Sequence, residues 1–470
     1  MNTQPAIILS KKQKFAVSLA SIFMMFSIAM FGLSLSTLQA PMLEQIGAMD
    51  YFSLVSIVSI LGLSIMTPIG GKLGDLVGRR NLIIFSGTIS IVCGIGIGFA
   101  KTLVPFIIFR FLLGTAMGAF VSAPYILARE INEPKDVPKM MGFLSSGIAV
   151  GGLLGSVIAG TLMDLGYLVL AITFPVIPLF LGVILIAFNL PNNKSNKKVK
   201  LDAAGIILMA ISLSLILLAL NYAPKYGFKD IKILGGMVIG LIIGVIFLKI
   251  EKNAEEPLIP IKLLENKNYV VLLCIGFIGY FYMNAMNIYA PLVTIKVLGK
   301  PKSIAGLLQL PRTIITVILP VLAGAWVARK RSNHKIAMII ATTLVAIPMF
   351  VMSFTNLNTN VILYIIMIGV TGVAESFRAV SITTMAQTCL DPQDLGIGTS
   401  LVNFINTLSG LAAASIFGIS YDLKTKADPT DVGNILAGAN SVYLIAAIVS
   451  LIGLAIVIFC TRDIFQKNEN

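Results

Sequence analysis

Glu375 and Arg378 stand three residues apart in an apolar stretch that reads Gly-Val-Ala-Glu-Ser-Phe-Arg-Ala. On a helix this spacing brings both side chains to one face, where the carboxylate and the guanidinium can pair. An apolar environment favours the neutral carboxyl group, whereas the neighbouring arginine favours the carboxylate. A carboxyl group balanced between these influences can bind and release a proton as its surroundings change. The pattern predicts either a proton carrier or a static ion pair within one helix.

Arg110 and Arg312 also lie in apolar stretches, and a buried guanidinium is costly enough to be a functional candidate. Arg312 either contacts a substrate cavity or extends its charged head to the membrane interface. Glu375 is the one carboxylate that we expect near mid-membrane, so three arginines face a single acid. A cavity lined by these groups is net positive and favours an amphipathic anion or weak acid over a cation.

Amide and phenol side chains near these charges are candidates for contacts with a substrate. Tyr280, Asn284 and Asn287 fall in one apolar stretch, and Gln39 falls in the first. Tyrosines near helix ends are also ordinary anchors at the membrane interface, so the two asparagines indicate a cavity more directly than Tyr280 does. We predict that these four residues, together with Arg312, line a substrate cavity.

Membrane-spanning helices must position these side chains. The chain of 470 residues is 57% hydrophobic and 12% charged, with a mean hydropathy of +0.93, which excludes an ordinary soluble globule. Apolar runs of about 20 residues recur, each long enough to cross the hydrocarbon core of a bilayer as a helix. We predict an all-α integral membrane fold with spans near 15–38, 52–70, 82–100, 103–127, 140–162, 167–190, 203–222, 232–250, 269–292, 304–328, 335–354, 360–385, 394–420 and 437–461.

The positive charges are distributed unevenly between the two sides of the predicted bilayer. Of 35 Lys and Arg residues, 23 fall in segments on the side of the N-terminus and nine on the other side. Cytoplasmic loops of membrane proteins carry such an excess of positive charge, so we expect both termini in the cytoplasm. We expect this multi-pass protein in the plasma membrane. The loop with Asp391 and Asp394 is the exception, because it contains no base. The net charge of +14 is thus a topology signal and requires no nucleic-acid partner.

A short polar segment, Gly-Lys-Leu-Gly-Asp-Leu-Val-Gly-Arg-Arg at 71–80, joins the second and third predicted spans. It resembles the loop between helices 2 and 3 of major facilitator superfamily transporters, whose pattern is G-x-L-a-D-r-x-G-R-R/K. The residues on the marked positions are Gly71, Leu73, Asp75, Gly78, Arg79 and Arg80. We predict that this gate loop acts as a latch, with Asp75 pairing with Arg79 or facing the positive end of a neighbouring helix. A purely structural turn is the alternative.

The order of the spans resembles the fourteen-span drug:proton antiporter branch of this superfamily. That layout implies an N-terminal six-helix bundle at 1–190, a linker with two extra helices at 191–268, and a C-terminal six-helix bundle at 269–470. The loop 251–268, with its acidic, Pro-Leu and Asn-Lys elements, also resembles the branch. The resemblance implies two bundles that rock about a midplane cavity.

Three positions depart from the pattern of this branch. Arg110 matches an R-x-x-Q-G element linked to proton coupling, but Leu113 stands at the glutamine. In the glycine-rich stretch 147–160, Gly152 stands where antiporters have a proline, and we interpret the stretch mainly as a helix-packing surface. Gly32 stands where the branch usually has an aspartate in span 1. These departures weaken the expectation of cationic-drug export.

Other classes of protein find little support in the sequence. No G-x-x-x-x-G-K-[ST] motif is present, so ATP is not expected to drive transport. Four scattered cysteines and one histidine, His334, which we expect to be solvated, suggest neither a metal site nor a catalytic cluster. We therefore expect no enzyme activity, no metal and no cofactor, and a monomer whose partners are protons, lipid and a small solute.

The resemblance implies proton-coupled efflux of small amphipathic organic molecules by antiport. Glu375 is the expected proton carrier, acting with Arg378 and Arg110. The net positive charge keeps an alternative open, which is proton-coupled uptake of an organic anion such as a bile acid.

Overall fold

The structure is a computed structural model that describes residues 7–48, 51–192, 203–227, 229–253, 257, 261–301, 304, 307–426, 428 and 431–461. These residues form helices and short connections, and no strand occurs among them. Residues 193–202 of the predicted linker and parts of the loop 251–268 lie outside the described residues.

Fourteen of the described helical segments are long and apolar enough to cross a membrane, judged by length and composition. This confirms the predicted all-α integral membrane fold. The segments are Lys11–Gln45, Ile57–Val77, Arg79–Phe99, Leu103–Glu130, Val137–Asp164, Leu168–Asn189, Ala204–Ala223, Ile231–Lys252, Lys267–Lys296, Leu310–Val327, Ser332–Met352, Val361–Thr388, Leu395–Thr425 and Val432–Cys460.

The chain divides into two compact units. One consists of Met1–Ser214, Ile243–Leu263 and Leu390–Phe404, and the other of Leu215–Ile242, Leu264–Cys389 and Ile405–Asn470. Helix α18 (Leu395–Thr425) thus contributes its first residues to the first unit and the remainder to the second.

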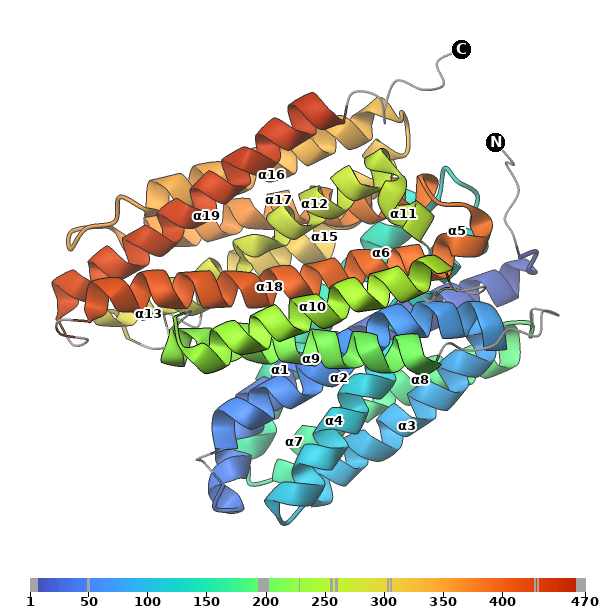
Figure 1. The fold of residues 1–470 in the computed structure, drawn as a ribbon, viewed down its shortest axis with the longest axis horizontal. Coiled ribbons are helices and arrows are strands. Elements are labelled where there is room, and N and C mark those ends of the chain that lie inside the picture. The colour runs from blue at the N-terminus through green and yellow to red at the C-terminus, as the bar shows by residue number, and fades with distance from the viewer. Residues whose placement is uncertain are drawn as a thin grey trace. The chain divides into compact units, whose positions relative to one another are not determined.

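In the first unit, helix α1 (Lys11–Gln45) packs along α6 (Val137–Asp164), and α2 (Phe52–Val77) packs along α4 (Leu103–Phe120). Figure 1 shows these helices with α3 (Arg79–Phe99) and α8 (Val176–Asn189). The α1–α6 contact depends on the glycine-rich stretch, since a Cβ atom at Gly151 would lie 2.2 Å from the carbonyl oxygen of Phe26. The stretch is a close helix-packing surface, as its small residues indicated.

In the second unit, helix α17 (Val361–Thr388) packs against α15 (Leu310–Val327) and α16 (Ser332–Met352). Helix α19 (Val432–Cys460) contacts α16 and α12 (Lys267–Phe281). The ninth span is not a single regular helix, because a π-helical segment, η2 (Ala285–Tyr289), joins α12 to α13 (Ala290–Lys296). Aromatic contacts hold this span to α18, with the Phe281 and Phe417 rings 5.2 Å apart and edge to face.

The two additional helices are α9 (Ala203–Tyr226) and α10 (Ile231–Asn253). Of the fourteen described spans α10 is the least buried, and it carries a row of exposed aliphatic residues. Within the second unit, Ala219, Ala223 and Ile233 of this hairpin form a small cluster against Ile419 of α18. The Ser415 hydroxyl of α18 donates a hydrogen bond to the Leu220 carbonyl of α9.

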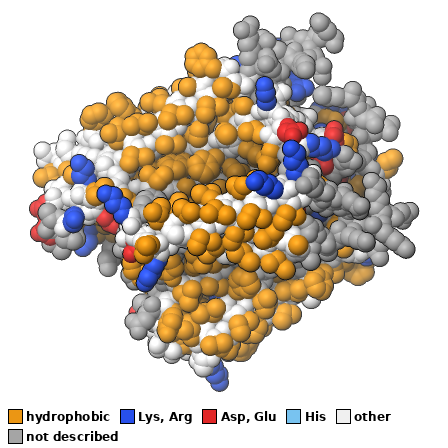
Figure 2. Space-filling view, viewed as in Figure 1, with side chains coloured by type: hydrophobic (Ala, Val, Ile, Leu, Met, Phe, Trp, Pro, Cys, Tyr) orange, Lys and Arg blue, Asp and Glu red, His pale blue; other side chains and the backbone are white. Residues whose placement is uncertain are grey.

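Large apolar side chains lie on the outside of the helices, as a lipid environment requires. Phe85, Phe188 and Phe459 are 69%, 83% and 78% exposed. Figure 2 shows hydrophobic side chains along the helices on the visible face, with charged side chains gathered near the helix ends. A folded protein surface of this kind is stable in contact with lipid tails, because the helices satisfy their own backbone hydrogen bonds.

Candidate functional site

Helix α17 places Glu375 and Arg378 on one face, and the two side chains form a bidentate ion pair. Arg378 donates from Nε to Glu375 Oε2 at 2.8 Å and from Nη2 to Oε1 at 2.5 Å. The Arg378 side chain is 11% exposed and the Glu375 side chain 15%. Sequence spacing correctly predicted that these two groups meet, because their contact depends on one helical turn.

Residues of α12 surround the arginine of this pair. The Tyr280 ring lies 4.8 Å from Arg378 Cζ, within the range of a cation–π contact. Gly279 leaves room for the arginine stem, since a Cβ atom there would lie 3.0 Å from Arg378 Cδ. Tyr280 therefore contacts the ion pair directly, and its role in lining a substrate cavity stays a prediction.

A small cavity of the second unit adjoins the ion pair. Glu375, Arg378 and Tyr282 share its lining with Thr342 and Ser450, among apolar residues of α12, α16 and α17. The cavity has a volume of about 10 Å³, which is near the minimum that holds one water molecule. The pair is thus not wholly enclosed by close-packed side chains.

Arg312 lies at the start of α15 with few hydrogen-bond partners. Its Nη2 donates to the Met283 sulfur at 2.9 Å, and its buried Nε has no partner. Glu375, Tyr280 and Tyr282 are close enough to act on it electrostatically. Sequence analysis selected Arg312 and Tyr280, and Tyr282 lies in the same Tyr-Phe-Tyr stretch.

The two predicted asparagines differ in their surroundings. Asn284 donates to the Gly410 carbonyl of α18 at 2.5 Å, so its amide holds two helices together. Asn287 is exposed in the π-helical segment η2. The structure therefore does not bring Asn284 and Asn287 into contact with the ion pair, and their role in binding a substrate stays a prediction.

The first unit contains a buried arginine of another kind. Arg110 of α4 is 5% exposed, and its Nη2 donates to the Gln39 side-chain oxygen at 3.0 Å and to the Val55 carbonyl at 3.4 Å. The Phe106 ring centroid lies 5.9 Å from its Cζ. No ion pair of Arg110 with a carboxylate occurs among the described residues. Gln39, predicted as a substrate contact, thus holds Arg110.

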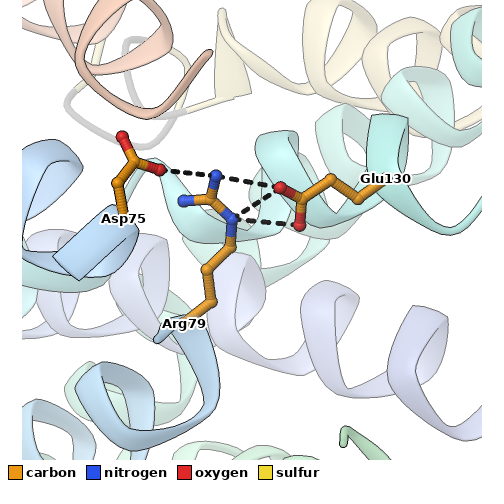
Figure 3. A network of polar contacts seen from close by, with 3 residues as sticks. All are labelled: Asp75, Arg79 and Glu130. Atoms are coloured by element: carbon orange, nitrogen blue, oxygen red, sulfur yellow. Dashed lines mark hydrogen bonds and ion pairs between the residues drawn. The ribbon is translucent and has the colours of Figure 1, made fainter. Parts of the chain in front are cut away.

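The gate loop forms a three-residue charge network, which Figure 3 shows in detail. Arg79 at the start of α3 contacts Asp75 at 2.8 Å and both carboxylate oxygens of Glu130, the last residue of α5 (Ala123–Glu130), at 2.9 and 3.0 Å. The predicted Asp75–Arg79 pair is present. Glu130 was missed, although an acid that ends the fourth span lies on the same side of the membrane as this loop.

The remaining gate-loop residues fix the backbone around this network. Asp75 Oδ2 faces the start of α18, because a Cβ atom at Gly396 would lie 2.2 Å from it. Both predicted environments of Asp75 therefore occur together. Gly71 packs against Gly396 as well, and Gly78 joins α2 to α3 with a φ of +87°, which L-residues rarely adopt. Arg80 donates to the Ala187 carbonyl near the end of α8 at 2.7 Å.

The loop with Asp391 and Asp394, which was the exception to the positive charge expected of cytoplasmic loops, has a basic partner. Lys262 of α11 (Ile261–Glu265) lies 2.9 Å from Asp394 and 3.5 Å from Asp391. The hydrogen bond with Asp394 raises the pKa of the Lys262 amine. Positive charge from a different loop therefore compensates Asp391 and Asp394.

No group of three or more His, Cys, Asp or Glu residues able to hold a metal occurs in the described part of the chain. The expectation for His334 was wrong, because this side chain is 6% exposed and lies at the start of α16.

Fourteen apolar helices with buried charged groups in both units define a multi-pass membrane protein of the transporter class. The sequence profile of the Major Facilitator Superfamily matches residues 17–414. The chain therefore belongs to the Major Facilitator Superfamily and is a transporter.

Relatives and solved structures agree with this assignment. The chain is 26% identical to Multidrug transporter protein MdtP of Bacillus subtilis over 405 residues, 84% of this chain and 73% of the relative. It is 24% identical to Multidrug resistance protein 3 of the same organism over 394 residues, 83% of this chain and 76% of the relative. The fold resembles the crystal structure of the human organic anion transporter MFSD10 (TETRAN) with a TM-score of 0.64 at 13% identity, covering 95% of this chain and 99% of that one.

Proposed function

We propose that this protein is a proton-coupled antiporter that exports small amphipathic organic molecules. The observation that carries this proposal is the Glu375–Arg378 pair, an acid and a guanidinium in bidentate contact inside a membrane-spanning helix. The multidrug transporters among its relatives support export as the direction.

The coupling step follows from the charge of this pair. When Glu375 is ionised, Arg378 is held and the pair is nearly neutral overall. Protonation of Glu375 removes its attraction for Arg378, and breaking such a buried pair changes the local free energy by about 3–5 kcal/mol. That is enough to bias a two-state equilibrium strongly. Arg110 acts as a fixed positive charge in the first unit.

The remaining expectations belong to the same proposal. The protein functions as a monomer in the cell membrane, with both termini in the cytoplasm and with bundles at 1–190 and 269–470 separated by the inserted segment 191–268. The Asp75–Arg79–Glu130 network is a latch of charge pairs that opens and closes during transport. Asn284, Asn287, Tyr280, Gln39 and Arg312 contribute to the substrate cavity.

The direct test is transport by purified protein in liposomes under an imposed pH gradient. We expect Glu375→Gln to abolish pH-driven accumulation while substrate exchange without a gradient is partly retained, because the amide cannot carry a proton. Glu375→Asp should retain part of the pH response. Glu133→Gln removes an exposed acid and is the matched control. An unchanged pH dependence in Glu375→Gln would refute the proposed carrier.

A second candidate is proton-coupled uptake of an organic anion of the bile-acid kind. It is favoured by Arg110 and Arg312, neither of which forms an ion pair with a carboxylate among the described residues. Cholate and tetraphenylphosphonium, tested in the same liposomes with the gradient imposed in either direction, separate the two candidates. Accumulation of cholate together with protons would establish uptake, whereas expulsion of either solute against protons would establish export.

A further inference from the structure

The charges around Glu375 do not balance within the second unit. Arg378 occupies both carboxylate oxygens of Glu375, and Arg312 is a second guanidinium on which Glu375 acts. No other carboxylate of the described residues forms an ion pair with either arginine. Two guanidinium groups therefore share one acid, which leaves one positive charge uncompensated in a largely apolar setting. Such a charge is costly unless an anion approaches it.

Two hydrogen-bond donors beside this excess charge also lack acceptors. The Arg312 Nε and the Tyr282 hydroxyl are both buried and have no hydrogen-bond partner by distance and angle, although the two side chains lie close enough to interact with each other. The Met283 sulfur bound by Arg312 Nη2 is a weak acceptor. Buried polar groups are ordinarily paired, because an unmade hydrogen bond costs about 1–3 kcal/mol. These two donors, one of which belongs to the excess guanidinium itself, indicate a ligand that supplies acceptors and negative charge.

The surroundings restrict that ligand further. A carboxylate or sulfonate offers oxygens to a guanidinium and to a hydroxyl at the same time. Tyr282 is 1% exposed and belongs to the aromatic and aliphatic core of the second unit, and the Tyr280 ring lies against Arg378. An ion with an apolar body matches these surfaces better than a small inorganic anion does.

We infer that Arg312 and Tyr282 form a subsite for the oxyanion of an amphipathic organic acid, which is the substrate class of this transporter. This inference rests on the proposed transport function but not on Glu375 as proton carrier. In the absence of the acid, Arg312 donates to the Met283 sulfur and lies beside Tyr282; when the acid binds, its oxyanion accepts hydrogen bonds from Arg312 Nε and the Tyr282 hydroxyl.

Binding to purified full-length protein in maltoside micelles tests the subsite without any transport step. We expect Arg312→Gln to weaken cholate binding about tenfold or more, since a charge-assisted hydrogen bond is lost, and to change tetraphenylphosphonium binding less than about twofold. Arg312→Lys should recover part of the cholate affinity, because the charge returns without the planar fork. Tyr282→Phe should weaken cholate about threefold to tenfold. Arg329→Gln, which removes an exposed cation just after α15, is the matched control.

Each outcome decides the inference. Equal losses for cholate and tetraphenylphosphonium in Arg312→Gln, no loss for either, or absence of cholate binding to the unsubstituted protein would overturn it. Displacement of cholate by equimolar phosphatidylglycerol would overturn the assignment to a solute, because the site would then hold a lipid. Thermal unfolding of each variant in the same micelles separates loss of the site from loss of the fold.

The same variants distinguish this inference from the proton-carrier proposal. If Arg312→Gln selectively weakens cholate binding while Glu375→Gln keeps the pH dependence of transport, the oxyanion subsite is supported and the proton-carrier role of Glu375 is refuted. If Glu375→Gln abolishes the pH dependence of transport while Arg312→Gln binds cholate with unchanged affinity, the proton-carrier role of Glu375 is supported and the oxyanion subsite is refuted.

Discussion

Arg110 and Arg378 are both arginines in apolar helices, yet their surroundings differ in kind. Arg378 pairs with a carboxylate on its own helix, at 2.8 and 2.5 Å. Arg110 pairs with neutral oxygens from Gln39 and Val55. A neutral partner keeps the arginine charged but offers no proton to exchange, whereas an acid partner can switch between two charge states. The same sequence signal therefore marks an arginine held by neutral oxygens in one unit and an arginine paired with a carboxylate in the other.

The largest loss of stability is expected when the acid of the Glu375–Arg378 pair is removed. Glu375→Ala should lower the free energy of unfolding by about 3–5 kcal/mol, because it leaves Arg378 buried and uncompensated. Unfolding by SDS in mixed micelles measures this change. The double variant Glu375→Ala, Arg378→Met should recover much of the loss, since both charges are then absent. A double variant as unstable as the single one would show that charge pairing is not the cause.

The contacts of Arg110 with neutral oxygens should contribute less to the free energy of unfolding. Gln39→Leu removes an acceptor from Arg110 and should lower the free energy of unfolding by about 2 kcal/mol, because Arg110 Nη2 then has only the longer contact with the Val55 carbonyl. The pH dependence of transport should be unchanged, because no group that titrates near neutral pH is lost. A shifted pH profile in Gln39→Leu would remove the distinction between the two arginines.

The loss of stability should be smaller still for the Asp75–Arg79–Glu130 network of the gate loop. Glu130→Gln keeps an oxygen that can accept from Arg79, and Asp75 still contacts the same guanidinium at 2.8 Å. We expect a loss of about 1 kcal/mol in unfolding free energy. Glu130→Lys is the contrasting variant, and it should be clearly worse because a like charge then faces Arg79. Equal stabilities for these two variants would contradict an electrostatic latch.

The smallest effect is expected at the exposed pair. Lys262→Gln removes a side chain that is 50% exposed and that contacts Asp394 at 2.9 Å. Exposed ion pairs contribute less than about 1 kcal/mol and are screened by salt. The difference between this variant and the unsubstituted protein should shrink further in high salt. A loss as large as that for Glu375→Ala would show that burial does not rank these pairs.

Contacts within one helical turn could be predicted, and contacts between helices could not. The Glu375–Arg378 and Asp75–Arg79 pairs follow from spacings of three and four residues. Glu130 reaches Arg79 across 51 positions and Gln39 reaches Arg110 across 71, so no local pattern marks them. Asn284 likewise reaches the Gly410 carbonyl across 126 positions.

The sequence by itself determined the class of this protein, because membrane insertion depends on the length and apolarity of single segments, and these can be read residue by residue. It also determined the family, through the gate loop at 71–80. Only the tertiary structure decided the partners of the charged groups: Arg110 contacts a neutral amide, Arg79 two acids and Lys262 Asp394, whereas Arg312 forms no ion pair with a carboxylate among the described residues. Compensation depends on distances of a few ångströms between helices, and packing alone sets those distances.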